Sequence, residues 1–458
     1  MANRPRRMPS LRALLRKHFP DALLVLLLAL LLAAPQAHAG DGAAAAPADA
    51  VAQVARGRYL ARIANCAACH TAPGGAPFAG GVVLRTGLGT IPSTNITPDA
   101  DTGIGAYSLA EFDRALRQGV ARGGKRLYPA MPYPSYARMT AEDVAALYAY
   151  LRAEVRPVRQ RQPAPQLRWP FGMRSLLVVW NLFFLEAPAD RASPRAAVAG
   201  GDAQWRRGAY LVQAVGHCGA CHTPRGLLHA EQGSDERSQS FLAGASVEGW
   251  SAGNLRGDKL SGLGGWSREE VAEYLRTGRN IHATSFGPMS GVIAASTQHM
   301  TPQDLDAMAA YLKSLPGVRG ESAPFRYDPA TAQALLQGRF DAPGARLYGQ
   351  YCMPCHGAGG KGFARVFPPL AGNPAVLDPD PSSLVNLLLG GAVTAAVDTA
   401  ATDYHMPGYG WALNDQELAD VLGFVRGGWG NRAAPVRDSE VAARRAALGI
   451  RLEAEASR

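Results

Sequence analysis

Apolar residues recur at intervals of three and four in three separate stretches of the chain, and each stretch begins at a residue suited to start a helix. The stretches are TAEDVAALYAYLRAE from Thr140, TPQDLDAMAAYLKSL from Thr301 and NDQELADVLGFVRG from Asn414. Each cap is followed three residues later by Asp or Glu, and Pro302 occupies a first turn, where its missing N–H costs no hydrogen bond. The pattern predicts three amphipathic helices, each with one buried face.

A second repeated segment precedes each of these helices. The three copies place aromatic and aliphatic residues just before a Cys-x-x-Cys-His sequence, and they read ARGRYLARIANCAACH (55–70), RRGAYLVQAVGHCGACH (206–222) and PGARLYGQYCMPCH (343–356). The first two repeats correspond further, because residues 102–120 align with residues 261–279. The chain of 458 residues also has 51 glycines and 33 prolines, which implies many turns. We therefore predict an all-α, loop-rich fold of three small tandem domains.

The repeats also set the predicted domain boundaries. We expect the first domain at 52–158, the second at 204–320 and the third at 342–432. Residues 159–203 are expected to form a linker that contains an apolar segment, and residues 321–341 a second linker. Residues 433–458, rich in Ala, Arg and Glu, are expected to form a C-terminal tail.

The N-terminus has the features of an export signal. A basic stretch is followed by the apolar run ALLVLLLALLLAA (22–34) and by the small residues AHA at 37–39. We predict a signal peptide over residues 1–39, cleaved after Ala39, and a periplasmic location; an uncleaved anchor is the alternative. Removing six basic residues and Asp21 lowers the net charge from +10 to +5. The remaining charge and the absence of a nucleic-acid motif argue against nucleic-acid binding.

The three Cys-x-x-Cys-His copies contain every cysteine of the chain. Disulfides or zinc half-sites would leave unexplained the histidine that follows each second cysteine. Covalent haem explains it, because two thioethers hold the porphyrin and the next imidazole reaches the iron. We therefore predict three covalently bound c-type haems. The thioether-forming residues are Cys66, Cys69, Cys218, Cys221, Cys352 and Cys355, and the iron-binding histidines are His70, His222 and His356.

The second axial ligand of each iron is expected to be a methionine thioether. Met131, Met289 and Met406 each lie 8 to 12 residues ahead of a final helix cap, and 61, 67 and 50 residues after the histidine of their repeat. We expect all three in loops. Proline after Met131 and Met406 restricts the backbone there, whereas Met289 follows a proline. Closing the sixth position with a thioether suits electron transfer rather than catalysis at the iron.

Several other residues compete with this assignment. His217, His282 and His405 are alternative iron ligands, although their placement is more typical of a propionate or backbone partner. The remaining candidates among the 10 methionines are interpreted as packing residues or as too close to a motif, and they are Met139, Met300, Met308 and Met353.

Two asparagines and two aromatic residues occupy matching places in the first two repeats. Asn95 corresponds to Asn254, and Tyr107 corresponds to Trp266. They are suited to hydrogen-bond and cover haem propionates. An ordinary turn and a core aromatic residue explain them equally well.

The most apolar stretch after the signal is SLLVVWNLFFL (175–185). It is too short to cross a bilayer. Six arginines between residues 152 and 174 precede it, with Glu154 the one acidic residue among them. A basic approach to an apolar segment is typical of a helix in the lipid interface, and packing inside the protein is the alternative.

These motifs resemble a known family over the whole chain after the signal. The segments that carry the resemblance include CAACHTAPGGAPFAGG, GTIPSTNITPDADTGIGAYS, LYPAMPYPSYARMTAEDVAALYAYL, GHCGACHTPRG, FPPLAGNP and MPGYGW. In order, they resemble the three-haem cytochrome c subunit of bacterial membrane-associated alcohol, gluconate and sugar dehydrogenases. The resemblance implies three cytochrome c-type domains, each wrapped around its haem, with the histidine and methionine ligands named above.

The resemblance also implies a function and partners. Such a subunit takes electrons from a separate dehydrogenase subunit of the PQQ, flavin or molybdenum type and passes them to ubiquinone or a downstream oxidase. It is expected to be peripheral on the outer face of the inner membrane. No site for oxidising a substrate is apparent in this sequence. The alternatives are a haem enzyme of the peroxidase or reductase kind, with one open iron, and a free soluble electron carrier.

Overall fold

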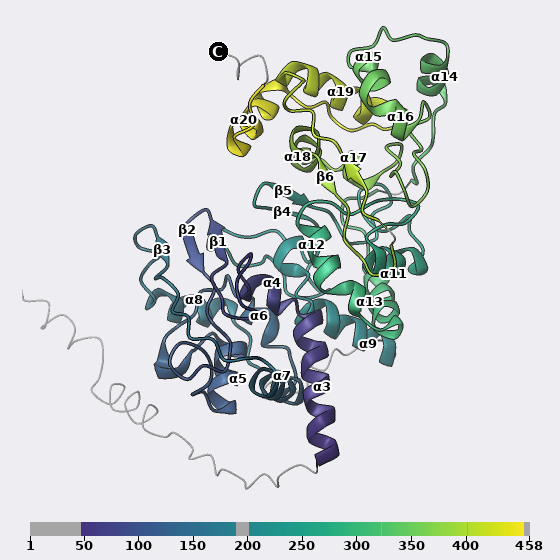
Figure 1. Ribbon diagram of the computed structural model, residues 1–458. Coiled ribbons are helices and arrows are strands. Elements are labelled where there is room, and N and C mark those ends of the chain that lie inside the picture. The colour runs from purple at the N-terminus through teal and green to yellow at the C-terminus, as the bar shows by residue number, and fades with distance from the viewer. Residues whose placement is uncertain (1–46, 189–200, 322, 401, 453–458) are drawn as a thin grey trace, which may run out of the picture. The chain divides into compact units, whose positions relative to one another are not determined.

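The computed structural model describes residues 47–188, 201–321, 323–400 and 402–452. The chain divides into two compact units, residues 1–50 and 51–458. The predicted signal peptide, 1–39, lies outside the described residues, as do parts of the predicted linkers and the end of the predicted tail. The architecture that follows is that of the second unit (Figure 1).

The first repeat begins with the helix α3 (Pro47–Ile63), whose neighbour α4 (Cys66–His70) carries the first cysteine motif. The strands β1 (Val83–Thr86), β2 (Gly89–Pro92) and β3 (Gln166–Leu167) form an antiparallel sheet in that order. Val83 pairs with Pro92 and Gly89 with Leu167. Three helices complete the repeat, namely α5 (Leu109–Gln118), α6 (Tyr133–Tyr136) and α7 (Ala141–Ala153).

The second repeat follows the helix α8 (Leu176–Phe184). Its first helix, α9 (Ala203–Tyr210), continues through a π-helical turn (Leu211–Val215) toward α10 (Gly219–His222). A two-stranded antiparallel sheet comes next, and the repeat ends in helices. These elements are β4 (Ala245–Val247), β5 (Trp250–Ala252), α11 (Arg268–Thr277), α12 (Pro288–Ala295) and α13 (Pro302–Ser314).

The third repeat has a different order of elements after its cysteine motif, because its two strands come after two helices rather than before them. The helices α14 (Ala330–Leu336) and α15 (Ala345–Leu347) lead through a π-helical turn to α16 (Met353–His356). The strands β6 (Ala392–Val393) and β7 (His405–Met406) pair antiparallel. The remaining helices are α17 (Pro374–Leu377), α18 (Ser382–Gly390), α19 (Asp415–Gly427) and α20 (Asp438–Leu448).

The three predicted helix caps form as expected. The side chains of Thr140, Thr301 and Asn414 accept hydrogen bonds from the backbone N–H three residues later, at 3.2, 3.1 and 2.9 Å. At Asn414 the third residue also reaches back, which completes a capping box. At the two threonines the third residue is an aspartate whose carboxylate does not bond back to the cap. Asp143 instead accepts a hydrogen bond from Tyr210, and Asp304 accepts one from Arg207.

The buried apolar residues form one core for the first two repeats, another for the third, and a small cluster in which Ile293 of the second repeat meets Ala395 and Val397 of the third. The first core runs from Leu60 to Leu315, and the second from Leu335 to Val441. The second core includes Val441 of α20, which lies in the stretch expected to be a tail.

Helices dominate the fold, as predicted. The three small sheets were not predicted, because their strands have two to four residues and little alternation.

Candidate haem sites

Each cysteine motif ends a short helix. α4, α10 and α16 have five, four and four residues, and the histidine of the motif is the last residue of each. Glycine or a β-extended threonine then turns the chain away. The imidazole is therefore carried at a helix C-terminus, with both cysteines within one turn of it.

Each of the three histidines makes the same kind of hydrogen bond to a backbone carbonyl. Nδ1 of His70 lies 2.7 Å from the carbonyl oxygen of Thr94, and Nδ1 of His222 lies 2.7 Å from that of Gly253. Nδ1 of His356 lies 3.0 Å from the carbonyl oxygen of Pro368. A carbonyl oxygen only accepts, so Nδ1 carries the proton and the lone pair of the neutral ring sits on Nε2. A hydrogen bond of this kind orients the ring of a histidine that binds metal.

The electrostatic surroundings keep these rings neutral. Burial lowers the pKa of His70, His222 and His356 more than the hydrogen bond to the carbonyl raises it. A neutral imidazole with Nε2 free is the form that donates to iron. The observed geometry thus fits the group that the motif predicts.

The cysteines are all free, and the first of each pair is set into the protein. Cys66, Cys218 and Cys352 pack against the cores, and burial raises the pKa of each thiol to about 12. Cys69 and Cys221 are exposed, which leaves them open to a large covalent group.

No side-chain cluster offers a rival metal centre in the part of the chain that the structure describes. Within those residues, no group of three or more His, Cys, Asp or Glu is arranged to hold a metal ion.

The three predicted methionine ligands are all partly buried against a core. Met131 and Met289 border the core of the first two repeats, and Met406 borders that of the third. Met131 lies in a loop, as expected. The loop prediction is wrong for the other two. Met289 sits in the first turn of α12, because Pro288 starts a helix there, and Met406 pairs with Ala392 in β7.

The competing candidates have other roles. Met139, Met300 and Met308 are almost fully buried, which agrees with their interpretation as packing residues. His282 places Nε2 at 2.9 Å from Glu270 and stacks on Trp266, with the ring centroids 5.2 Å apart.

The other two histidines are also accounted for. His217 places Nε2 at 3.4 Å from the carbonyl oxygen of Ala64 and packs edge-on against Tyr136. His405 is exposed in β7.

The matched asparagines stabilise turns. Asn95 and Asn254 are buried, and each accepts a hydrogen bond at 2.9 Å from the backbone N–H two residues later. Their amides donate to Val158 and Asp258, both at 2.7 Å. These bonds favour the turn interpretation over propionate binding. Each asparagine directly follows the carbonyl that orients the histidine of its repeat, so it fixes that carbonyl in place.

The carbonyls of Thr94, Gly253 and Pro368 are functional groups that sequence reasoning missed. A backbone oxygen has no side-chain signature, and these lie 24, 31 and 12 residues beyond their histidines. The matched asparagines were the one available signal for two of them.

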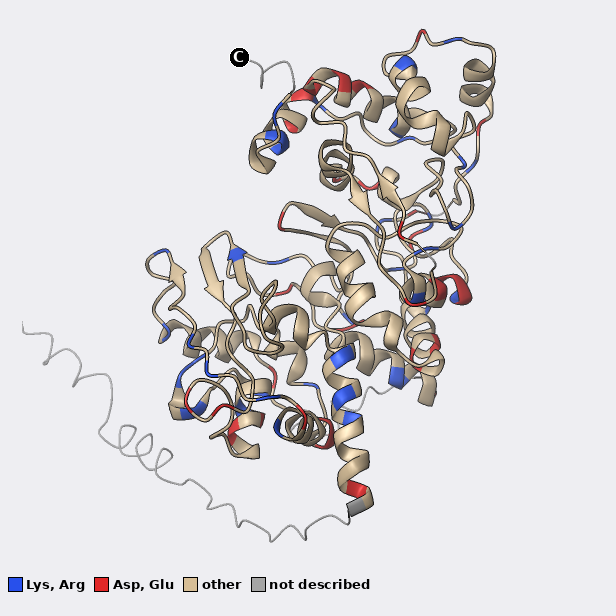
Figure 2. Ribbon diagram, in the orientation of Figure 1, with Lys and Arg blue, Asp and Glu red and all other residues tan. Residues whose placement is uncertain are grey.

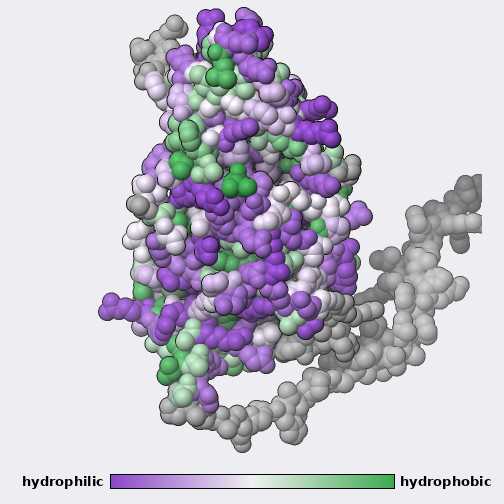
Figure 3. Space-filling model, turned by 90° about the vertical axis from the view of Figure 1, so that its right-hand side faces the viewer, coloured by the Kyte–Doolittle hydropathy of each residue, from purple (hydrophilic) through white to green (hydrophobic). Residues whose placement is uncertain are grey.

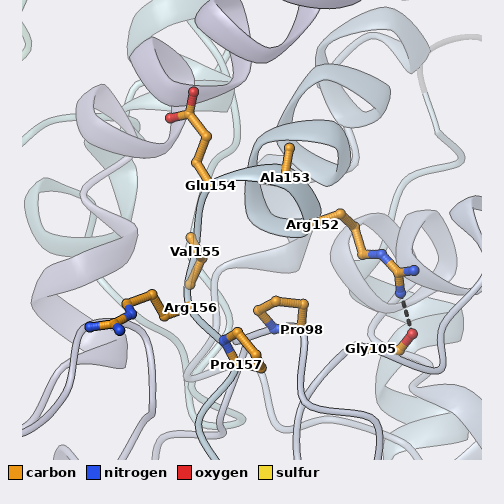
Figure 4. Close-up of a pocket in the computed structure, with 8 residues that line it drawn as sticks. All are labelled: Pro98, Gly105, Arg152, Ala153, Glu154, Val155, Arg156 and Pro157. Atoms are coloured by element: carbon orange, nitrogen blue, oxygen red, sulfur yellow. Dashed lines mark hydrogen bonds between the residues drawn. The ribbon is translucent and has the colours of Figure 1, made fainter.

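A surface pocket lies at the end of α7, apart from the cysteine motifs (Figure 4). Arg152 donates a hydrogen bond across it to the carbonyl oxygen of Gly105. The lining residues are Pro98, Gly105, Arg152, Ala153, Glu154, Val155, Arg156 and Pro157. None of the predicted site residues is among them.

Comparison with known proteins gives a consistent result. The family described as cytochrome c matches residues 54–153, 206–316 and 342–429. The cytochrome c subunit of a quinone alcohol dehydrogenase from Gluconacetobacter polyoxogenes is 46% identical over 398 residues, which cover 86% of this chain and 84% of the relative. The gluconate 2-dehydrogenase cytochrome c subunit of Pantoea cypripedii is 45% identical, over 86% and 89%. A diheme c-type cytochrome from Cereibacter sphaeroides is 35% identical, over 58% and 87%.

Proposed function

Because this chain belongs to the cytochrome c family, with its covalently bound haem, we propose that it relays electrons through three such haems and oxidises no substrate itself. One observation carries the proposal. In all three repeats the histidine of the motif has Nδ1 on a backbone carbonyl, which leaves Nε2 free for iron.

Four residues of each repeat would hold its haem. When bound, the haem iron supplies one-electron redox chemistry. Two cysteines of each repeat anchor the porphyrin through thioethers, and a histidine and a methionine hold the iron. The sets are Cys66, Cys69, His70 and Met131; Cys218, Cys221, His222 and Met289; and Cys352, Cys355, His356 and Met406. The proposed domains are 52–158, 204–320 and 342–432, in tandem after a cleaved signal peptide.

A separate dehydrogenase subunit is the proposed electron donor. The relatives are named as cytochrome subunits of alcohol, gluconate and fructose dehydrogenases, which supports a separate catalytic subunit as the donor. We place this chain in the periplasm, between a PQQ-, flavin- or molybdenum-containing subunit and ubiquinone or a downstream oxidase.

Haem content and spin state test this proposal. The purified holoprotein is expected to carry three haems per chain, all low-spin, and to co-purify with a larger catalytic chain from its host. Fewer than three haems would refute the relay. A high-spin haem that binds carbon monoxide readily would instead indicate an enzyme with an open iron.

The helix α8 is the proposed point of contact with the membrane. One of its faces is anchored, since Leu177 and Asn181 are buried and Tyr133 donates a hydrogen bond to Asn181 at 2.7 Å. The opposite face is apolar and open to solvent, with Leu182 79% and Phe183 72% exposed. Among the described residues, no helix is long and apolar enough to cross a bilayer.

Neighbouring residues extend this apolar surface. Trp180 donates a hydrogen bond at 2.9 Å to the carbonyl oxygen of Leu228, and both Leu227 and Leu228 are exposed. Arg174 lies 4.4 Å from the ring centre of Tyr128 beside it. Elsewhere, charges of both signs are interspersed over the ribbon (Figure 2), and the face in Figure 3 is mainly hydrophilic with small hydrophobic groups. A large apolar face beside arginines suits an anionic lipid surface.

Binding to vesicles of phosphatidylethanolamine and phosphatidylglycerol tests this contact. The double variant Leu182→Asn/Phe183→Asn is expected to lose at least about tenfold in affinity, because burying each side chain contributes about 1.5–3 kcal/mol. Leu336→Asn/Phe363→Asn is the matched control, since both side chains are exposed on the third repeat. Equal losses in the two variants would refute a specific role for α8.

A further inference from the structure

Arg279 is a buried arginine that pairs with no carboxylate among the described residues. It follows Gly278, the residue that ends α11, and its side chain is 9% exposed. Its Nη2 is buried without a hydrogen-bond partner among the described residues. The guanidinium lies over the ring of Tyr404 in the third repeat, 4.8 Å from the ring centre.

A buried guanidinium that lacks an acceptor is unfavourable, and arginine does not escape by losing its proton. Arg365, which lines the same cavity, is already neutralised, because it pairs with Glu273, with Nη2 to Oε2 at 3.2 Å. Arg279 therefore leaves an uncompensated positive charge at the boundary between the second and third repeats.

A cavity of about 250 Å³ opens beside this charge. The cavity is lined by the guanidinium of Arg279, by the hydroxyl-bearing side chains of Thr277, Thr399, Thr402 and Tyr404, and by the ion pair of Arg365 and Glu273. Its volume exceeds that of several water molecules, at roughly 30 Å³ each. The cavity thus has the space and the donors for a carboxylate.

The position of the cavity indicates which carboxylate. Arg279 lies ten residues before Met289, and Tyr404 lies two residues before Met406. The two chain segments that meet there are those that lead to the proposed methionine ligands of the second and third haems. The anionic groups that such haems bring are their propionates.

We propose that Arg279 binds a propionate carboxylate of one of these two haems and raises the midpoint potential of that haem. This inference rests on the proposed function. The guanidinium donates its free N–H groups to the carboxylate oxygens, and its positive charge favours the reduced iron.

Redox titration of the full-length holoprotein, with the three haems resolved, tests the proposal. Arg279→Gln is expected to lower the midpoint potential of one haem and leave the other two unchanged. Arg279→Lys keeps the charge and is expected to give a smaller shift of the same haem. Arg276→Gln is the matched control, because Arg276 is exposed on the last turn of α11 and its charge is screened by solvent.

Three outcomes would overturn the proposal. The first is that no midpoint potential changes in Arg279→Gln. The second is that Arg279→Lys and Arg279→Gln change the potential of one haem equally, which a purely structural role would give. The third is that the potential of the wild type follows added phosphate at constant ionic strength, which would assign the cavity to a free anion. Haem content of the wild type separates these results from failure of the relay itself, which would show as fewer than three low-spin haems.

Discussion

The contact between the first and second repeats differs in kind from the contact between the second and third. In the first, Tyr59 of one repeat donates a hydrogen bond at 2.7 Å to Asp304 of the other, and Tyr210 donates in return to Asp143. Asp304 is also held by Arg207 of its own repeat, with both hydrogen bonds at 2.8 Å. Asp143 and Asp304 are the third residues of α7 and α13, so each repeat contributes the same tyrosine and the same aspartate to the contact. We call this reciprocal pairing the mirror relation.

The second and third repeats meet through contacts without this mirror relation. Asn386 donates at 2.9 Å to the carbonyl oxygen of Gly249, and Ser383 accepts at 2.9 Å from the N–H of Ser251. In α19 the matching acidic residue is Glu417, which bonds back to its own cap at 2.8 Å.

The difference shows that one helix position serves two purposes. Where a partner repeat supplies a tyrosine, the acidic residue joins two repeats that share a core; where none does, it closes a capping box. The first two repeats are therefore expected to unfold together, and the third by itself.

Loss of a haem is expected to give the largest difference between the paired first two repeats and the third repeat. Cys218→Ala/Cys221→Ala prevents attachment in the second repeat, and we expect two haems per chain and early unfolding of the first repeat as well. Cys352→Ala/Cys355→Ala, the matched change in the third repeat, is expected to leave the other two haems and their potentials intact. Haem assay and limited proteolysis measure both. Equal damage to the first repeat in the two variants would contradict the shared core.

A cavity in either core is the next largest change. Leu60 and Leu418 are both 1% exposed, one in each core. Truncation of either to Ala is expected to cost about 2–5 kcal/mol. Calorimetry is expected to show Leu60→Ala lowering only the transition of the first two repeats, and Leu418→Ala only that of the third. A single transition that moves in both variants would show that all three repeats unfold as one.

Removing one tyrosine hydroxyl tests the mirrored contact itself. Tyr59→Phe and Tyr210→Phe are each expected to lower the free energy of unfolding of the first two repeats by about 1–3 kcal/mol, since each leaves a buried carboxylate short of a donor. Tyr409→Phe is a control, because this hydroxyl donates to the carbonyl oxygen of Tyr351 within the third repeat. Denaturant unfolding compares them, and a loss on one side alone would refute the mirror relation.

Acid is expected to have the smallest effect. Burial tends to raise the pKa of Asp304, but hydrogen bonds from Arg207 and Tyr59 outweigh it and hold that pKa below its ordinary value of about 4. A lowered pKa stabilises the fold above that ordinary value, and the contribution is lost as pH falls through the folded value. Unfolding midpoints from pH 7 to pH 2 are expected to show this loss, and Asp304→Asn is expected to flatten it. An unchanged acid slope in that variant would assign the loss to other groups.

Much of the candidate site could be predicted because its chemistry is local in the chain. Cysteine spacing and the histidine beside it lie within five residues, and the caps at Thr140, Thr301 and Asn414 within four. Met289 shows the limit. Pro288 before it is a local signal for the first turn of a helix, and this signal prevails over the loop pattern of the matching positions.

Neighbours along the chain were enough to predict the haem-attachment motifs and the caps of the three helices that follow them, because both patterns are local. Only the folded chain shows which carbonyl lies beside each histidine, that Tyr59 reaches an aspartate 245 residues away, and that Nη2 of Arg279 is buried without a hydrogen-bond partner among the described residues. Backbone oxygens have no sequence signature, and contacts between distant residues depend on how whole helices pack.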